Sequence, residues 1–176
     1  NKVPILIDEA YFGFFKETYL PYVKKYRYLI ISRTFSKTYG LAGVRAGYLV
    51  ASQKIAKALY KLKPMYEISS FASLIVEEIL KNKKIFYNYA NEVEQGKKYL
   101  IKEFEKLQIE YLKTYANFIH IKLNSKKKKF ENILKIKKIL VRKGPGVKGF
   151  EGYLRIGLGP KPEMRKVISL LKKLKN

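Results

Sequence analysis

Apolar residues in the first fifty positions fall into short continuous runs, separated by polar and glycine-rich stretches. Runs at residues 3–7, 28–32 and 47–51 are rich in Val, Ile, Leu and Tyr. They are too short for helices, so we expect buried strands. A continuous run is typical of a strand that is covered on both faces, as in a parallel sheet. We therefore expect an α/β fold built on a parallel sheet.

Further along, apolar residues recur every three or four positions, which predicts helices at residues 53–62, 70–80 and 84–107. Ser52 and Ser69 precede the first two helices as caps. The third helix carries an apolar stripe made of Phe86, Tyr89, Val93, Leu100, Phe104 and Leu107. Its length suits a connection between two domains.

The C-terminal part of the chain mixes both patterns. Strands are expected at residues 109–112, 118–123, 139–141 and 153–156. Helices are expected at residues 130–138 and 161–174, with Pro162 in the first turn of the second. This order indicates a small α+β domain. The expected division is residues 1–83, a first domain; 84–107, a linker helix; and 108–176, a small C-terminal domain.

A polar loop between two of the expected strands holds Lys37. Thr34 and Ser36 place hydroxyl groups before the lysine, and Arg45 follows it in a glycine-punctuated segment. Hydroxyl groups, backbone amides and a guanidinium together can cradle a phosphate. A lysine beside such a cradle can form a Schiff base with a phosphorylated aldehyde cofactor, although an ordinary solvated lysine is the alternative.

The first strand ends in Asp8-Glu-Ala-Tyr11. Ligands of open parallel α/β sheets gather at the carboxyl ends of the strands, so this segment and the Lys37 loop are expected to meet at one edge. From the sequence, either Asp8 or Glu9 can be the working acid, and Tyr11 either binds a ligand or packs.

Four motifs carry a family resemblance: Asp8-Glu-Ala-Tyr11, Ser32-Arg-Thr-Phe-Ser-Lys37, Gly40-Leu-Ala-Gly-Val-Arg45 and Tyr153-Leu-Arg155-Ile-Gly. Together they resemble the pyridoxal-phosphate-dependent aminotransferases of class I/II, in particular the histidinol-phosphate aminotransferases. The resemblance implies that residues 1–83 are the later part of a fold-type-I large domain, with a mixed, mostly parallel sheet and helices, and that a small α+β domain follows it. It also implies pyridoxal 5'-phosphate as the cofactor.

The resemblance assigns a role to each candidate residue. Lys37 would hold the cofactor and shuttle protons, while Asp8 would pair with the pyridine nitrogen. Tyr11 would contact the phenolic oxygen of the cofactor. The phosphate would be bound by Thr34, Ser36 and Arg45.

Arg142 and Arg155 are expected on neighbouring strands joined by a glycine-rich loop. The resemblance gives Arg155 the substrate carboxylate or phosphate, with Arg142 beside it, although a surface charge is the alternative for Arg142. The loop Gly144-Pro-Gly-Val-Lys-Gly149 matches a dinucleotide-binding pattern. A strand follows it rather than a helix, so we interpret it as a hairpin loop.

Composition narrows the class of protein. The 176 residues include no Cys and one histidine, His120, so neither disulfides nor a metal site is expected, and His120 reads as a structural residue. The formal net charge of +24 would suit nucleic acid, but the lysines are spread along the whole chain, which favours a compositional bias. No apolar run is long enough to span a membrane, so a cytoplasmic protein is expected.

The matched motifs belong to the later half of a typical family chain. We therefore expect a fragment that is inactive by itself, and the resemblance implies a homodimer. The leading hypothesis is transfer of an amino group between a small phosphorylated amine or amino acid and 2-oxoglutarate or glutamate. The alternatives are a decarboxylase of phosphorylated amino acids and a non-catalytic basic binding fragment.

Overall fold

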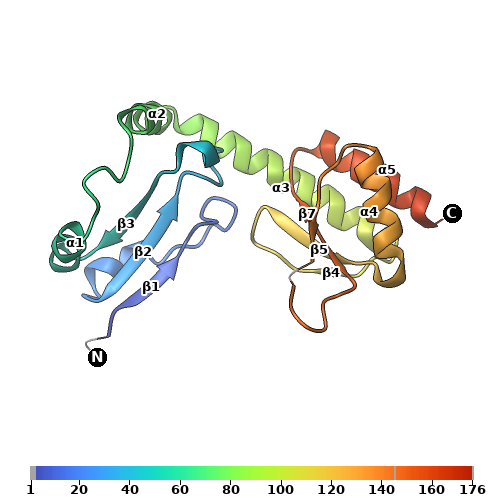
Figure 1. The fold of residues 1–176 in the computed structure, drawn as a ribbon, viewed down its shortest axis with the longest axis horizontal. Coiled ribbons are helices and arrows are strands. Elements are labelled where there is room, and N and C mark those ends of the chain that lie inside the picture. Colours follow the sequence, from blue (N-terminus) through green and yellow to red (C-terminus); the bar gives the residue numbers. More distant parts are fainter. Residues whose placement is uncertain (1–2, 145, 176) are drawn as a thin grey trace. The chain divides into compact units, whose positions relative to one another are not determined.

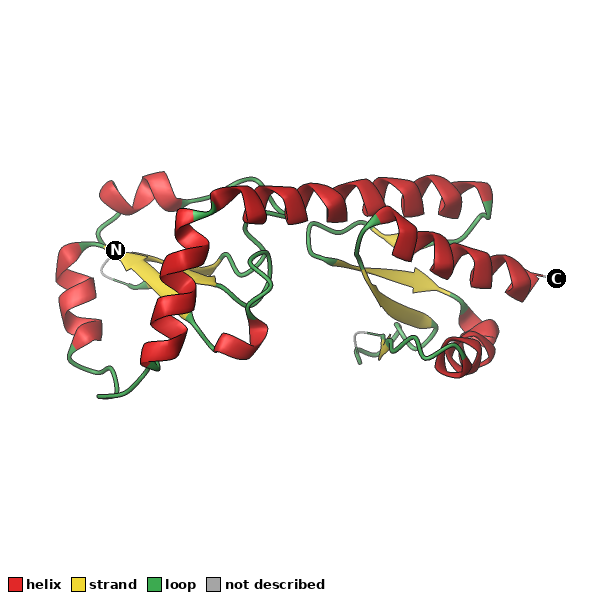
Figure 2. Cartoon of the chain, turned by 90° about the horizontal axis from the view of Figure 1, so that it is seen from above, coloured by secondary structure: helices red, strands yellow, loops and turns green. Residues whose placement is uncertain are grey.

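The computed structural model describes residues 3–144 and 146–175 of the chain. It divides into two compact units, residues 1–90 (unit 1) and residues 91–176 (unit 2). Both units combine a sheet with helices, as Figures 1 and 2 show, so the expected α/β class is confirmed. The long helix α3 (Lys83–Lys106) contributes residues to each unit.

Unit 1 is built on a three-stranded sheet in the order β1-β2-β3. The strands are β1 (Ile5–Asp8), β2 (Leu29–Thr34) and β3 (Gly47–Ala51). β1 and β2 are parallel, whereas β2 and β3 are antiparallel. The sheet is thus mixed, with one pair of each kind. Its most buried residue is Ile31 in the central strand, where it packs with Val23 and Leu29.

The helices of unit 1 follow the sheet. Two short 3-10 turns, η1 (Leu20–Lys24) and η2 (Ala42–Val44), lie in the loops before and after β2. Helix α1 (Gln53–Tyr60) ends two residues before the predicted end, and α2 (Ser70–Lys81) follows it. Ser69 caps α2 by accepting a hydrogen bond from the Ala72 amide. Ser52 precedes α1 as predicted, but its hydroxyl instead donates to the Arg27 carbonyl.

Unit 2 contains a four-stranded antiparallel sheet in the order β4-β5-β7-β6. The two long strands are β5 (Phe118–Lys122) and β7 (Tyr153–Gly157); the flanking strands are β4 (Tyr111–Leu112) and β6 (Arg142–Lys143). Helices α4 (Lys127–Ile136) and α5 (Lys161–Lys175) complete the unit, with a 3-10 turn, η3 (Asn124–Lys126), before α4.

One face of this sheet carries the core of unit 2. Ile119 and Ile121 of β5 are fully buried on that face, together with Leu154 of β7. Helices α3, α4 and α5 bring Phe104, Phe130 and Leu171 to the same core, and the apolar stripe predicted for α3 is confirmed at Val93, Leu100 and Phe104. Side chains alternate along a strand, so Phe118, His120 and Lys122 lie on the opposite face.

The strand predicted at residues 139–141 is wrong. Helix α4 is followed by Lys138 in the left-handed region at φ 56°, and the Ile139 amide closes the turn on the Leu134 carbonyl. Leu140 is then 92% exposed, and pairing with β7 begins only at Arg142. The apolar run at residues 139–141 is therefore an irregular segment between the turn after α4 and the start of β6.

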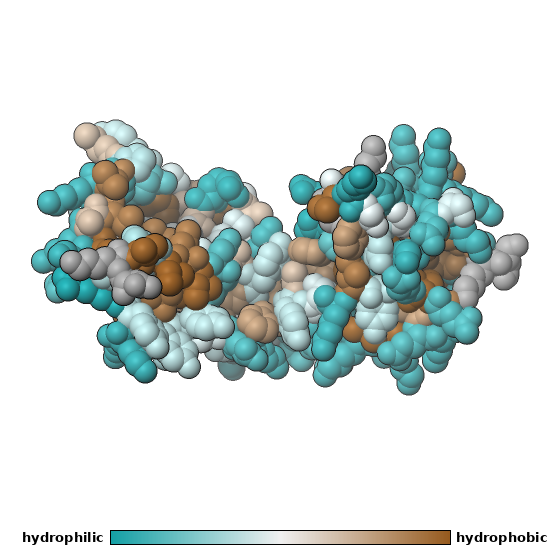
Figure 3. All heavy atoms as spheres, turned by 90° about the horizontal axis from the view of Figure 1, so that it is seen from below, coloured by the Kyte–Doolittle hydropathy of each residue, from teal (hydrophilic) through white to brown (hydrophobic). Residues whose placement is uncertain are grey.

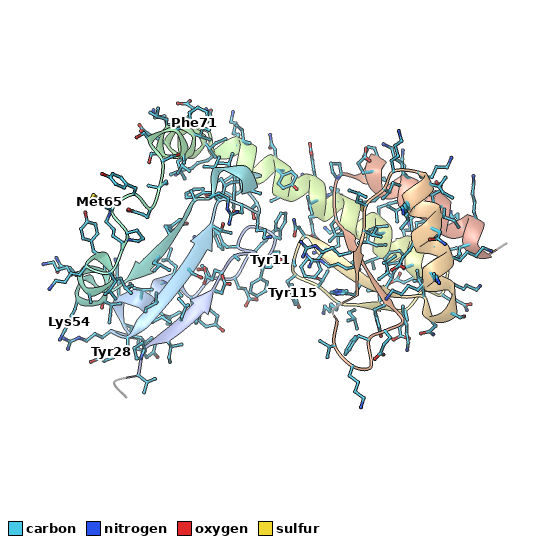
Figure 4. All side chains as sticks on the ribbon, viewed as in Figure 1. Tyr11, Tyr28, Lys54, Met65, Phe71 and Tyr115 are labelled. Carbon is cyan, nitrogen blue, oxygen red and sulfur yellow. The ribbon has the colours of Figure 1, made fainter. Side chains whose placement is uncertain are left out.

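Unit 1 exposes many apolar side chains. Ile5 and Leu6 of β1 are exposed, and so are Met65 and Phe71, which point outward from the segment around α2 (Figure 4). A large apolar area is visible on this unit in Figure 3. Ile5 and Leu6 are adjacent in β1, so this strand exposes apolar residues on both faces, and unit 1 presents sheet surface of the kind that is normally buried. No helix within the described part of the chain is long and apolar enough to cross a membrane.

A buried carboxylate joins two helices of unit 2. Glu103 of α3 is 7% exposed and accepts hydrogen bonds from Lys106 of α3 and Lys172 of α5, at 2.8 and 2.9 Å. These two ammonium groups lower the pKa of Glu103 from 4.5 to about 2. The ionised carboxylate therefore stabilises the folded state.

We expect Glu103→Gln to lower the free energy of unfolding at neutral pH. Because the folded pKa is depressed, the difference from wild type is fully present above pH 4.5 and shrinks as the pH falls toward about 2. Urea unfolding at a series of pH values measures it. Glu105→Gln, an exposed glutamate on the same helix, is the control; an equal loss for both variants would contradict the prediction.

Candidate functional site

The parallel pairing of β1 and β2 brings two candidate segments to one edge of the unit 1 sheet. Asp8, the last residue of β1, lies opposite Ser32 of β2, and the Glu9 amide donates to the Ser32 carbonyl at 2.9 Å. β2 then ends at Thr34, and the Lys37 loop follows. Both segments leave the sheet at the carboxyl ends of parallel strands, as the sequence predicts.

Asp8 presents an open carboxylate at this edge. Its Oδ1 accepts hydrogen bonds from the Ala10 amide and the Ser32 hydroxyl, both at 3.0 Å. Its Oδ2 accepts none from the described residues, and no cation lies within ion-pair distance among them. The side chain is exposed, so it is oriented at one oxygen and available at the other.

Glu9 is not available in this way. Its carboxylate accepts from the Thr18 hydroxyl and the Tyr19 amide, and Arg33 binds it through Nε at 3.0 Å and Nη2 at 2.8 Å. Both charged side chains are nearly buried, with 7% and 10% of their surface exposed. Of the two acids that the sequence left open, only Asp8 has a carboxylate oxygen free to meet a ligand.

The Arg33 guanidinium also stacks on the ring of Phe12, 3.6 Å from its centroid. Arg33 therefore ties the loop after β1 to β2 through a charge pair and a stacked ring. Sequence reasoning missed this network. The available signal was strand alternation, which turns the side chains of Asp8 and Glu9 to opposite faces.

The Lys37 loop folds tightly on itself. The Ser36 amide donates to the Thr34 hydroxyl, and the Gly40 amide donates to the Lys37 carbonyl. Phe35 is buried beneath the loop. Lys37 is half-exposed, and its Nζ lies 5.7 Å from the centroid of the Tyr11 ring (Figure 4 labels Tyr11). The structure thus brings the candidate lysine and the candidate tyrosine together.

Thr38 fastens this loop to the loop after β1. It is 2% exposed, and its hydroxyl donates to the Phe12 carbonyl at 2.7 Å. Gly13, at φ 103°, lets the two segments approach, because a Cβ there would lie 2.7 Å from the Thr38 methyl and 2.6 Å from the Phe86 ring. Thr38 was not among the predicted residues, and no periodicity of the chain marks it.

The three residues predicted to bind phosphate lie around the same loop, but they are engaged differently. The Thr34 hydroxyl bonds within the loop, to Ser36 and Ala46, whereas the Ser36 hydroxyl has no partner among the described residues. The Arg45 side chain is exposed, and its backbone has φ 57°. One N–H of its guanidinium donates to the Ala42 carbonyl at 3.0 Å. Ser36 and Arg45 therefore retain donors for an anion.

In unit 2, Arg142 and Arg155 lie on the neighbouring strands β6 and β7, as predicted, and the register places them directly opposite each other. The Arg155 guanidinium stacks on the Phe118 ring at 3.7 Å. The glycine-rich loop connects two antiparallel strands, which confirms the hairpin interpretation; its Pro145 lies outside the described residues.

The residues at the edge of the unit 1 sheet fit a pyridoxal phosphate group by chemistry. A lysine, an open aspartate, a tyrosine and an arginine lie on segments that the fold holds together. The cavity beside Asp8 and Tyr11 measures about 110 Å³, smaller than a typical cofactor site. The described part of the chain also holds no cluster of three or more metal-binding side chains.

The sequence matches the profile of the family described as "Aminotransferase class I and II" over residues 1–171. The chain belongs to this family. Among relatives, it is 35% identical to a histidinol-phosphate aminotransferase of Pyrococcus furiosus and 37% identical to one of Carboxydothermus hydrogenoformans. The matches cover 96% and 97% of this chain but 47% of each relative, so the chain spans about half their length.

Solved structures share this aminotransferase fold. A histidinol-phosphate aminotransferase from Clostridium acetobutylicum aligns with a TM-score of 0.86 at 24% identity, over 99% of this chain and 55% of the other. An L-threonine-O-3-phosphate decarboxylase from Porphyromonas gingivalis gives 0.82 at 20%, over 97% and 54%. The Sinorhizobium meliloti histidinol-phosphate aminotransferase, solved with pyridoxal-5'-phosphate, gives 0.72 at 23%, over 97% and 48%.

We expect Arg33→Met or Glu9→Gln to destabilise the protein strongly. Removing one partner leaves the other charge or carboxyl group in a nearly buried place, at a cost of about 3–5 kcal/mol for breaking such a pair. Urea unfolding of both single variants and the double variant measures the coupling. Lys81→Met, which breaks an exposed pair on α2, serves as the control and should change stability far less.

Thr38→Val should leave the Phe12 carbonyl unpaired, at a cost of about 1–3 kcal/mol. Thr38→Ser keeps the hydroxyl and should retain most of the stability. Limited acetylation followed by peptide mass spectrometry should also show a changed reactivity of Lys37 in the valine variant only. Equal behaviour of the two variants would refute a positioning role for the hydroxyl.

Proposed function

We propose that this chain is the cofactor-binding later half of a pyridoxal-phosphate-dependent aminotransferase of the histidinol-phosphate type. The observation that carries the proposal is the meeting of Asp8 and the Lys37 loop at one edge of a parallel strand pair. Residues 1–83 would belong to the large domain, 84–107 to a linker helix and 108–176 to the small domain.

When bound, pyridoxal phosphate supplies an aldehyde that forms a Schiff base with an amine and a ring that accepts electron density. In the proposal, Lys37 is the amine that anchors it. The Nζ of Lys37, as a free amine, would also take a proton from the substrate carbon and return one during amino-group transfer.

Asp8 would accept the hydrogen bond of a protonated ring nitrogen. Its Oδ1 is fixed by Ala10 and Ser32, which leaves Oδ2 for that contact. A carboxylate there holds the proton on the ring nitrogen, because the opposite charge favours the charged form of the ring. Tyr11, under the Lys37 ammonium, would donate its hydroxyl to the phenolic oxygen beside the anchored lysine.

Ser36 and Arg45 would hold the phosphate. The guanidinium offers a two-pronged contact, and the Ser36 hydroxyl a single one. The Thr34 hydroxyl would act through the loop, because it already fixes the Ser36 amide and contacts the Ala46 carbonyl.

Arg142 and Arg155 would receive the anionic end of the substrate. Two guanidinium groups on facing strand positions suit a carboxylate or a phosphate. This supports a small phosphorylated amine or amino acid as one substrate and glutamate or 2-oxoglutarate as the other, in amino-acid biosynthesis. We also propose a homodimer in the cytoplasm, with turnover requiring the part of the family chain that these residues do not match.

A decarboxylase of phosphorylated amino acids is the second candidate, because a solved decarboxylase shares the fold at a TM-score of 0.82. The two activities differ in their products. Carbon dioxide released without a change in 2-oxoglutarate would indicate the decarboxylase.

The proposal is tested by incubating the chain with pyridoxal phosphate, reducing with borohydride and mapping the adduct by peptide mass spectrometry. The same test is run in the presence of a second polypeptide, the half of a relative that this chain does not match. Labelling concentrated on Lys37, and lost from that peptide in Lys37→Arg, is expected. Labelling spread evenly over surface lysines in both preparations would overturn the anchor and favour a basic binding fragment.

A further inference from the structure

Three cationic or titratable side chains form a row across the open face of the unit 2 sheet. His120 of β5 lies opposite Arg155 of β7, and Arg155 lies opposite Arg142 of β6. Directly opposed residues of antiparallel strands place their side chains on the same face. This face lies opposite the one that carries the buried side chains of Ile119 and Ile121.

The row has no counter-charge from the described residues. None of its three members forms an ion pair there, and like charges directly opposite one another in a sheet destabilise it. The carboxylate of Glu110, near this face, already accepts hydrogen bonds from the Lys122 ammonium and the Tyr153 hydroxyl. Two facing arginines without a carboxylate between them are therefore an arrangement that an added anion would stabilise.

The Phe118 ring holds the row together. Arg155 stacks on it at 3.7 Å, while the His120 imidazole meets it edge-on at 5.4 Å between ring centroids. His120 Nε2 is buried and has no hydrogen-bond partner among the described groups. The imidazole is thus confined next to a guanidinium, with one polar atom unsatisfied.

We propose that Arg142, Arg155 and His120 form an oxyanion site in which anion binding is coupled to proton uptake by His120. The inference rests on the proposed function, which assigns the two arginines to the anionic end of the substrate, and it adds the histidine as a positioning residue. In the free protein, burial and the neighbouring Arg155 favour the neutral form of His120. An oxyanion compensates the guanidinium charge and favours the imidazolium.

Electrostatics gives the direction of the coupling. Burial lowers the pKa of His120 below its ordinary 6.5, and the charge of Arg155 adds to the effect. The other groups facing His120 are Leu112 on β4 and, along β5, Phe118 and the Glu110-paired Lys122. A bound anion opposes the Arg155 effect, so it raises the pKa of His120, and by linkage the anion binds more tightly as the pH falls.

The single histidine of the chain makes the test direct. Its Hε1 proton is followed by NMR from about pH 5 to 8, with and without sulfate, at an ionic strength matched with chloride. Sulfate is a tetrahedral oxyanion that remains a dianion throughout. We expect it to raise the pKa of His120 by about 0.5, which corresponds to about threefold tighter binding to the protonated form. A second series with glutarate distinguishes a carboxylate end from a phosphate-like end.

Variants separate the contributions. Arg155→Gln should raise the pKa of His120 in the free protein and abolish its response to sulfate, and Arg142→Gln should weaken sulfate binding. His120→Asn should bind sulfate with an affinity independent of pH. Arg165→Gln, at an exposed arginine of α5, is the matched control and should behave as wild type.

The inference is overturned if neither anion moves the pKa of His120, or if Arg165→Gln abolishes the response as Arg155→Gln does. These results leave the adduct on Lys37 unaffected. Conversely, a sulfate response without specific labelling of Lys37 would uphold the proton-linked site and refute the proposed cofactor chemistry.

Discussion

The candidate cofactor site depends on the buried pair of Glu9 and Arg33. It joins the loop after β1 to the second strand of the sheet, and the stacking of Arg33 on Phe12 extends the connection to the segment that Thr38 binds. Asp8 and Lys37 are carried by these two segments, which leave adjacent parallel strands. Without the pair, the two loops would be joined by the Thr38 and Ser32 hydroxyl groups and by backbone hydrogen bonds, with no charged link between them. The neighbours of the functional side chains thus determine their geometry.

The two faces of the unit 2 sheet have different roles. Its sheet is covered on one face by helices and open on the other, so alternation along β5 separates the core residues Ile119 and Ile121 from the polar row that includes His120. The covered face supplies stability, and Glu103 adds a charge network between α3 and α5. The opposite face carries two facing arginines. Their mutual repulsion destabilises the sheet, and the stability supplied by the core offsets it.

The sequence predicted what depends on local pattern. Continuous apolar runs identified β1, β2 and β3, and the parallel arrangement of two of them predicted that Asp8 and the Lys37 loop leave the sheet at the same edge. The hairpin between Arg142 and Arg155 was also predictable, because the glycine-rich loop is followed by a strand and not by a helix. The prediction of a strand at residues 139–141 was wrong, because an apolar run does not show whether a neighbouring strand exists to pair with it.

What could not be predicted involves side chains distant in the sequence. Arg33 and Glu9 are 24 residues apart, and Thr38 and the Phe12 carbonyl are 26 apart. Only the register of the folded sheet brings such groups together, so neither composition nor periodicity predicts these contacts. The choice between Asp8 and Glu9 remained open for the same reason, because it depends on which carboxylate the rest of the fold has already bonded.

The contrast between these two acids also explains why a short carboxylate occupies the strand end. Asp8 is the only aspartate of the chain, and every other acidic residue is a glutamate. A side chain with one methylene keeps its carboxylate close to the backbone, so the Ala10 amide and the Ser32 hydroxyl can hold one oxygen while the other faces outward. Glutamate has one more rotatable bond to order and reaches further, which suits Glu9 and its distant partner Arg33. In a chain with a formal charge of +24, an acid that does not pair with any nearby cation must be held by neutral donors, and the end of β1 provides them.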